Sequence, residues 1–362
     1  MRTVHHFLEG TTVRKTELCS VVIPTSNRKN RLLRTIRSIQ AQTYENLEIL
    51  VSNDGSTDGT SSAVMALNDP RIVLVSSDHR TGVSAARNRG IAASSGEFVA
   101  VCDDDDFWVP GKLAGQIEQL HKDRSDWAYC FEVVVDDRLR PLHEGRPLPG
   151  PDFMKRMSSG NPIPGGCSGV VARRSLLDET GWFDPEFSMF ADWELWVRFA
   201  AVSEPSLWPF PGVLYVVHPS QMTRDMRTVD EEFRRFLSRI EPHRRAHGHL
   251  TIEPIYLWMG TKQWQSGRRL DAVRMLMMNK TLRQRRAGAY VVAVRAAGEL
   301  GIHRRRSVGS DALAAVDSVR TLLHHEPGVG IEQTPWPIPT GPEYSRTVAG
   351  SIDQRSQEDR AT

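Results

Sequence analysis

Cysteine is scarce in this chain, and the few cysteines make neither a metal motif nor a disulfide framework. The 362 residues include four cysteines, which are widely spaced and form no C-x-x-C pair: Cys19, Cys102, Cys130 and Cys167. Each lies in an apolar, strand-like stretch, where a buried free thiol is the ordinary state. The pattern excludes a small disulfide-stapled scaffold and favours a reducing compartment.

Long hydrophobic runs are also absent. No stretch reaches the roughly 18 uninterrupted apolar residues of a transmembrane helix, and the start, MRTVHHFLEG, lacks the apolar block of a signal peptide. The formal net charge of +2 gives no reason to expect wholesale nucleic-acid binding. We therefore expect a cytoplasmic protein, which could touch a membrane only peripherally from that side.

Between residues 18 and 120, short β-rich runs alternate with amphipathic helical segments. The expected strands are CSVVIP, LEILVS, RIVLVS and EFVAVC, and Leu32, Leu33, Ile36 and Ile39 recur at helical spacing after the first of them. Such alternation predicts an α/β fold with a mainly parallel sheet flanked by helices. Ligands bind such a sheet at the carboxyl ends of its strands.

Polar residues follow three of these strands and should therefore meet at one edge of the sheet. They are Pro24, Thr25 and Asn27 after the first strand, Asn53 and Asp54 after the second, and Asp103–Asp106 after the fourth. Any one group could be an ordinary turn or helix cap, but three together favour a binding site. The four adjacent carboxylates repel one another unless they are solvated, as at a helix entry, or gather around a positive group.

In four ordered motifs the chain resembles the family 2 glycosyltransferases, whose fold is of the GT-A type. The motifs are VVIPTSNR, LEILVSNDGSTDGT, TGVSAARNRGIAASSGEFVAVCDDDDFW and GWFDPEFSMFADWELWVRFA, and the likeness covers roughly residues 18–219. Several independent motifs in the right order make the resemblance specific. It implies a Rossmann-like sheet and an inverting transfer of a sugar from a nucleoside diphosphate to a hydroxyl of a saccharide or lipid-linked saccharide.

The same resemblance implies a metal site in the run of aspartates. It places the family's D-x-D motif at Asp103 and Asp105, with His218 as a further ligand of metal or phosphate. Manganese or magnesium (Mn²⁺ or Mg²⁺) held there would neutralise charge on the departing diphosphate. A solvated helix entry is the alternative for the aspartates, and a structural strand-end histidine is the alternative for His218.

The resemblance also implies a donor pocket. Its nucleotide-sugar contacts would be Pro24, Thr25, Asn27, Asp54, Arg87, Asp103 and Asp104. Asp54 matches the position that accepts the imide proton of the base, which favours a UDP-sugar, although a carboxylate could also accept from guanine. The fork of Arg87 would pair with phosphate, unless Arg87 and Arg89 are only helix-surface charges.

For the catalytic base the resemblance points to Asp192, with Glu194 in reserve. Residues two apart on a helix point about 200° apart, so both cannot face one hydroxyl. The family's usual glutamate before the base is replaced by Ala191. A nucleotide-sugar-binding protein that no longer transfers therefore stays an alternative, as does an N-cap role for Asp192. Trp182, Trp193 and Trp196 could floor the acceptor site or pack in the core.

Along the chain we expect an N-terminal extension at residues 1–17, the GT-A domain at 18–225, a helical extension at 226–306 and a mostly disordered tail at 307–362 with one short helix near 311–323. The Pro- and Gly-rich segment 140–166 reads as a long surface loop. Basic residues between Lys280 and Arg306 could rest on anionic lipid, although a solvated face is the simpler role.

Overall fold

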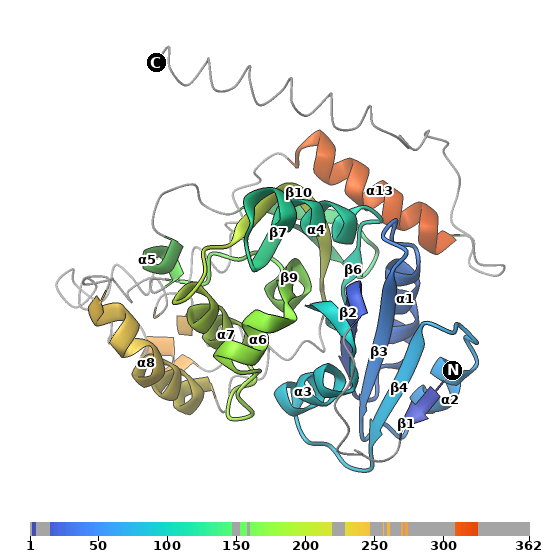
Figure 1. Cartoon of the computed structure of the whole chain (residues 1–362), viewed down its shortest axis with the longest axis horizontal. Helices are drawn as coiled ribbons and strands as arrows, with labels where there is room; N and C mark the ends of the chain where they lie inside the picture. Colours follow the sequence, from blue (N-terminus) through green and yellow to red (C-terminus); the bar gives the residue numbers. More distant parts are fainter. Residues whose placement is uncertain are drawn as a thin grey trace. The chain divides into compact units, whose positions relative to one another are not determined.

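The centre of the molecule is a ten-stranded mixed sheet with helices on both faces (Figure 1). The computed structural model describes residues 2–4, 15–146, 153–157, 160–218, 229–246 and 308–324, with a few single positions between 256 and 273. The strand order is β1-β4-β3-β2-β5-β9-β7-β10-β6, and β8 pairs with β7 beside this path. The expected α/β class is confirmed.

The N-terminal half of the sheet is parallel. Its strands are β1 (Arg2–Val4), β2 (Lys15–Thr25), β3 (Leu47–Asp54), β4 (Ile72–Ser77) and β5 (Gly96–Val101), connected by the helices α1 (Lys29–Gln40), α2 (Thr60–Met65) and α3 (Val83–Ala93). Leu32, Ile36 and Ile39 on α1 are fully buried, as their spacing predicts. Val22 pairs with both Leu50 and Val101, so the carboxyl ends of β2, β3 and β5 lie at one edge.

Close packing of α3 against this sheet depends on one glycine. A Cβ atom at Gly90 would lie 2.4 Å from Cγ1 of Val22 on β2. Only a residue without a side chain lets the helix approach the strand so closely. The helix that carries Arg87 is thus fixed against the centre of the sheet.

The second half of the sheet mixes strand directions. After β6 (Phe107–Trp108) and α4 (Lys112–Asp123) come β7 (Trp127–Asp136), β8 (Pro141–Gly145), β9 (Val170–Arg173) and β10 (Ser206–Val217). β10 runs parallel to β7, whereas β9 is antiparallel to β5 and β7. The expected loop at 140–166 is wrong in part, because its first residues form β8 against β7 and residues 153–157 form α5 (Phe153–Met157). Pro141 is tolerated as the first residue of an edge strand.

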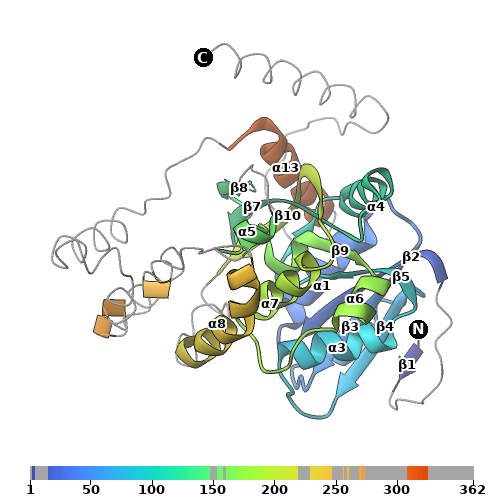
Figure 2. The same cartoon turned by 60° about the vertical axis from the view of Figure 1, so that its left-hand side comes forward.

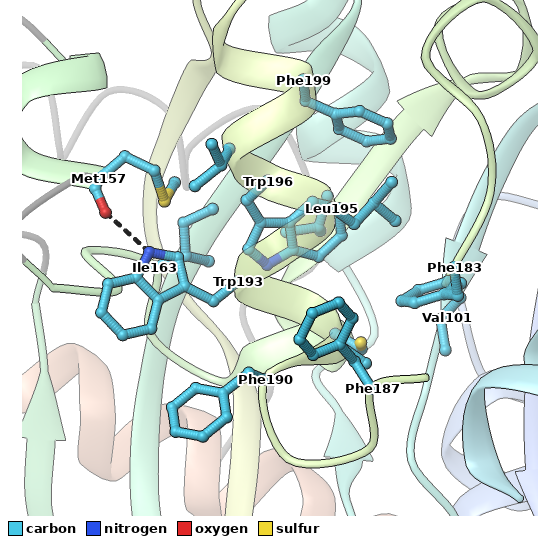
Figure 3. Close-up of a cluster of buried hydrophobic side chains, with 14 of the residues drawn as sticks. Val101, Met157, Ile163, Phe183, Phe187, Phe190, Trp193, Leu195, Trp196 and Phe199 are labelled. Carbon is cyan, nitrogen blue, oxygen red and sulfur yellow. Dashed lines mark hydrogen bonds between the residues drawn. The ribbon is translucent and has the colours of Figure 1, made fainter. Parts of the chain in front are cut away.

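Helices pack a large aromatic core against β7. They are α5, the 3₁₀ turn η1 (Gly166–Gly169), α6 (Arg174–Thr180), α7 (Ala191–Ala200) and α8 (Val229–Ala246), and Figure 2 shows α8 beside α7. Trp196 stacks on Trp127 with ring centroids 5.8 Å apart. The Trp193 indole N–H donates to the Met157 carbonyl at 2.7 Å (Figure 3). Trp193 and Trp196 are thus buried in the core, which is their packing role, whereas Trp182 is only partly buried against it.

One further helix packs on the far part of the sheet. The helix α13 (Ser310–His324) matches the one expected near 311–323, and its buried face covers Val133 and Val135 of β7 and Leu214 and Val216 of β10. The chain divides into compact units of residues 1–323 and 324–362. The basic stretch from Lys280 to Arg306 and the last 38 residues lie outside the described residues. No described helix has the length and apolar character to cross a bilayer.

Candidate active site

The four consecutive aspartates that follow β5 have different surroundings. Asp106 is 1% exposed, and its carboxylate accepts hydrogen bonds from the Ser168 hydroxyl at 2.7 Å and the Val216 N–H at 3.2 Å. Burial and the charges of Asp105 and Asp103 raise the pKa of Asp106 well above its usual range. Asp106 therefore ties the end of β5 to β10, whereas the side chain of Asp103 is 34% exposed.

Arg28, at the start of α1, bridges the middle of the acidic run. Its guanidinium donates to Asp104 at 2.9 Å and to Asp105 at 2.8 Å, and Thr25 donates to Asp104 at 2.7 Å. The imidazole Nε2 of the buried His218 lies 2.8 Å from Asp105. Residues from β2, the β5 loop and the end of β10 thus meet in one cluster, as the shared edge of the sheet predicts.

Arg87 connects the acidic run to the segment that carries Asp192. Its side chain is 5% exposed and donates to Asp103 at 2.7 Å, so it is not a helix-surface charge. Burial raises the pKa of Asp192 to about 6, while the positive charge of Arg87 lowers it and the negative charge of Asp103 raises it. The structure therefore brings Asp103, Arg87 and Asp192 within electrostatic reach of one another.

Asp192 and Glu194 have separate surroundings. The amide of Asn161 donates to the Asp192 carboxylate at 3.4 Å, and a Cβ atom at Gly166 would lie only 3.2 Å from its Oδ2. Glu194 is 2% exposed and accepts a hydrogen bond of 2.7 Å from Arg198, one helical turn later. The Glu194 carboxylate is thus engaged within α7, while that of Asp192 lies beside the first residue of η1.

Asp54, at the end of β3, holds the loop that leads into α3. Its carboxylate accepts hydrogen bonds from the N–H and hydroxyl of Thr81, the N–H of Gly82 and the guanidinium of Arg89. Burial alone would raise the pKa of Asp54, but these bonds outweigh it and lower the pKa. A carboxylate offers about four lone-pair sites, so a nucleobase would have to displace one of these donors.

The other expected donor contacts lie at the same edge. Pro24 and Thr25 end β2, and Asn27 follows in the left-handed region with φ of 54°. The Asn27 side chain accepts from the Thr57 N–H at 2.8 Å, and the backbone N–H of Asn27 donates to the Ser56 hydroxyl. Asn27 thus joins the β2 loop to the NDGST turn, which lines this edge.

Comparison with known proteins identifies the family. A model described as glycosyl transferase family 2 matches residues 20–181. The uncharacterized glycosyltransferase YwdF of Bacillus subtilis is 30% identical over 54% of this chain and 73% of its own length. The chain belongs to glycosyl transferase family 2.

Two further comparisons describe the kind of family 2 protein that this chain is similar to. The UDP-Glc:alpha-D-GlcNAc-diphosphoundecaprenol beta-1,3-glucosyltransferase WfgD of Escherichia coli is 36% identical over 34% of this chain, and the match spans about half (49%) of that relative. The structure of Staphylococcus aureus TarS 1–349 in complex with UDP-GlcNAc aligns with a TM-score of 0.53, at 16% identity, over 84% of this chain and 92% of that 1–349 chain. This family 2 glycosyltransferase has the GT-A fold.

Asp103, Asp105 and His218 carry donor atoms that a divalent metal accepts, but they do not form a complete metal site. Carboxylate oxygens of Asp103 and Asp105 and the His218 nitrogen are donors that manganese or magnesium accepts. Within the part of the chain that the structure describes, no three acidic, histidine or cysteine side chains group around a possible ion. Asp103 is turned to Arg87, so a metal on Asp105 and His218 would need oxygens from the donor diphosphate.

Several residues of this site were not singled out from the sequence. Arg28 carries a detectable signal, since a basic residue follows the β2 motif at the same edge as the aspartates. Glu232 of α8 has none, although its carboxylate accepts from the N–H groups of Ser188 and Phe190, both at 2.8 Å, and from the Ser188 hydroxyl at 2.9 Å. These bonds fix the segment directly before Asp192.

The same segment is held from the other side by α3. The Ser84 hydroxyl donates to the Phe187 carbonyl at 2.5 Å, and the amide of Asn88 exchanges two hydrogen bonds with the backbone of Phe183. Because Arg87 lies on the same helix, this cation and the segment that leads to Asp192 share one support.

Proposed function

We propose that this family 2 glycosyltransferase is an inverting, divalent-metal-dependent enzyme that moves a hexosyl group from a UDP-sugar to a hydroxyl of a lipid-linked saccharide. The observation that carries the proposal is the position of Asp192, a part-exposed carboxylate within electrostatic reach of the Arg87–Asp103 pair at the carboxyl edge of the sheet. This is where open α/β sheets bind their ligands.

Asp192 suits the role of general base. With a pKa of about 6, its carboxylate is ionised at neutral pH and still basic enough to accept a proton. As the acceptor oxygen attacks the anomeric carbon, its proton passes to Asp192. The bond between the sugar and the β-phosphate breaks in the same displacement, and its electron pair leaves on the diphosphate, so the anomeric configuration inverts.

The donor side of the proposal uses the residues that surround the acidic run. Arg87 offers its fork to phosphate, while Thr25, Asn27, Asp54 and Asp104 border the base and ribose. Asp105 and His218 would hold a divalent cation, together with Asp103 if its carboxylate turns from Arg87, and the cation when bound would neutralise charge on the diphosphate. UDP is favoured because TarS is described in complex with UDP-GlcNAc and WfgD is named for UDP-Glc.

The proposed acceptor follows from the same relatives. WfgD is named for a GlcNAc-diphosphoundecaprenol acceptor, which is a saccharide on a membrane lipid. Action on such an acceptor implies work at a membrane surface, in line with the cytoplasmic and peripheral location expected from the sequence.

The test is transfer and binding measured in parallel with UDP-glucose and manganese. Asp192→Asn should lower transfer by about 10²- to 10⁴-fold while leaving UDP-glucose affinity, measured by calorimetry, unchanged. Glu186→Gln, an exposed carboxylate on the preceding segment, serves as the matched control and should retain transfer. Equal loss of transfer and binding in Asp192→Asn would contradict the assignment.

The second candidate, a nucleotide-sugar-binding protein without transfer, is favoured by Ala191. This residue is 1% exposed in the aromatic core. The carboxylate of the family's usual glutamate is therefore missing beside the proposed base. The same experiment separates the two functions, because the second predicts tight donor binding with no transfer and no release of UDP by the native chain.

A further inference from the structure

One carboxylate near Asp192 is used by none of the groups above. Glu132 lies on β7, where its cross-strand neighbours are Gly145 of β8 and Val213 of β10. The flanking residues Val133 and Val135 pack under α13. Because side chains alternate across a strand, Glu132 projects from the opposite face, away from α13.

On that face Glu132 meets the turn that Asp192 also borders. A Cβ atom at Gly165 would lie 3.6 Å from the Cβ of Glu132, and a Cβ atom at Gly166 would lie 3.2 Å from Oδ2 of Asp192. Gly165 and Gly166 are consecutive and both have positive φ angles, of 71° and 51°. Side-chain atoms of Glu132 and Asp192 therefore lie beside successive residues of one tight turn.

Tyr215 relates Glu132 to the donor side of the site. Burial raises the pKa of the Tyr215 phenol, and the negative charges of Asp106, Glu132, Asp103 and Asp105 raise it further. Glu132 and the acidic run are thus both within electrostatic reach of one half-buried side chain.

The Glu132 carboxylate has little within the protein to stabilise its charge. Among the described residues no basic side chain lowers its pKa, and the group that does so is the backbone N–H of Gly165. Burial raises its pKa to about 7, and the Gly165 N–H opposes this only in part. The side chain lies over Gly145, where a Cβ atom would come within 2.5 Å of its Oε1. A half-buried carboxylate without a cation is costly to keep.

We propose that Glu132 binds the acceptor, by accepting a hydrogen bond from a second hydroxyl of the saccharide whose reacting hydroxyl faces Asp192. This inference rests on the proposed function and names the substrate class for that side of the site, a neutral sugar ring with free hydroxyls. Glu132 supplies from β7 a carboxylate that the chain lacks at Ala191, beside the base. The ionised form of Glu132 is a pure acceptor, which suits a sugar hydroxyl as the donor.

The test uses the full chain with manganese, UDP-glucose and, as acceptor probe, N-acetylglucosaminyl diphosphate on a short alkyl chain. In Glu132→Gln the KM for this probe should rise about tenfold or more, because a neutral amide oxygen accepts a weaker hydrogen bond than a carboxylate does. UDP-glucose affinity and the slow hydrolysis of UDP-glucose by water should stay within about twofold of the native values. Glu132→Asp, which keeps the charge but shortens the side chain, should give an intermediate KM.

The outcomes separate this inference from the proposed function. An unchanged KM in both variants, in a native chain that transfers to the probe, overturns the role of Glu132 alone. A parallel loss of donor affinity and donor hydrolysis in both variants shows a structural role and also overturns it. A native chain that neither transfers nor hydrolyses UDP-glucose overturns the proposed function itself. Glu118→Gln, an exposed carboxylate on α4, is the control and should match the native chain.

Discussion

The guanidinium of Arg87 donates a hydrogen bond to the Asp103 carboxylate at 2.7 Å, and its positive charge also lowers the pKa of Asp192. One buried cation on α3 therefore acts on carboxylates from the acidic run and from the segment before α7. The donor side and the proposed base are linked through a single side chain.

Replacing Arg87 should affect both sides. In Arg87→Gln we expect UDP-sugar affinity to fall by about tenfold or more, because a charge-assisted hydrogen bond to phosphate is lost and Asp103 keeps an unpaired charge. Calorimetry with UDP and manganese measures the loss. Arg239→Gln removes an exposed ion pair with Asp184 and should leave affinity unchanged. An unchanged affinity for UDP in Arg87→Gln would show that Arg87 does not bind the donor.

The rate of transfer should depend on pH through Asp192. Its carboxylate must be ionised to accept a proton, and its pKa is raised to about 6. The value of kcat at saturating acceptor should therefore rise with pH through about 6 and level off above 7. In Arg87→Gln, where the cation that lowers this pKa is gone, the rise should move to higher pH. A native profile that is already flat at pH 5 would contradict the assignment.

Glu232 should behave as a positioning residue. Glu232→Ala removes three hydrogen bonds to Ser188 and Phe190, so the segment before Asp192 loses its support from α8. We expect kcat to fall by about tenfold or more while UDP-sugar affinity is retained, since a small misplacement of a catalytic group is costly. Glu231→Ala on the exposed side of the same helix is the control. An equal fall in donor affinity would argue for a general loss of structure.

The contact between α13 and the sheet should contribute to stability. Val316 is fully buried against Val135 and Leu214, so Val316→Ala should lower the free energy of unfolding by about 2 kcal/mol. Leu313→Ala, at a position that is 45% exposed, should cost much less. Chemical denaturation of both variants checks the difference, and equal effects would show that α13 does not pack in solution.

Lys112 should destabilise the fold at neutral pH. Its amine is fully buried over the Trp108 ring, and no side-chain or backbone acceptor among the described residues bonds it. Burial lowers its pKa, so the cost of the charged form is greatest at low pH and fades as pH rises toward the usual value of lysine. Lys112→Met should raise the melting temperature at pH 7, with a smaller gain at pH 10. A lower melting temperature at pH 7 would mean that the cation–π contact outweighs burial.

The elements between residues 18 and 120 could be predicted because their signals are local. Apolar residues at strand and helix spacing reveal which faces are buried, as with Leu32, Ile36 and Ile39. Parallel strands share a carboxyl edge, so the polar residues after β2, β3 and β5 had to meet there. β8 was missed because proline and glycine at its ends carry turn signals, and only pairing with β7 makes the segment a strand.

The sequence by itself determined the family, the α/β class and the edge of the sheet at which Thr25, Asp54 and the four aspartates gather, because motif order and short-range periodicity are written in neighbouring residues. Only the tertiary structure decided the partners of each carboxylate. Asp106 and Glu194 accept hydrogen bonds from within the protein, and Arg28 bridges Asp104 and Asp105. Glu132 lies at the turn beside Asp192. Such pairings join residues many positions apart, and their energies depend on burial and distance, which exist only once the chain has folded.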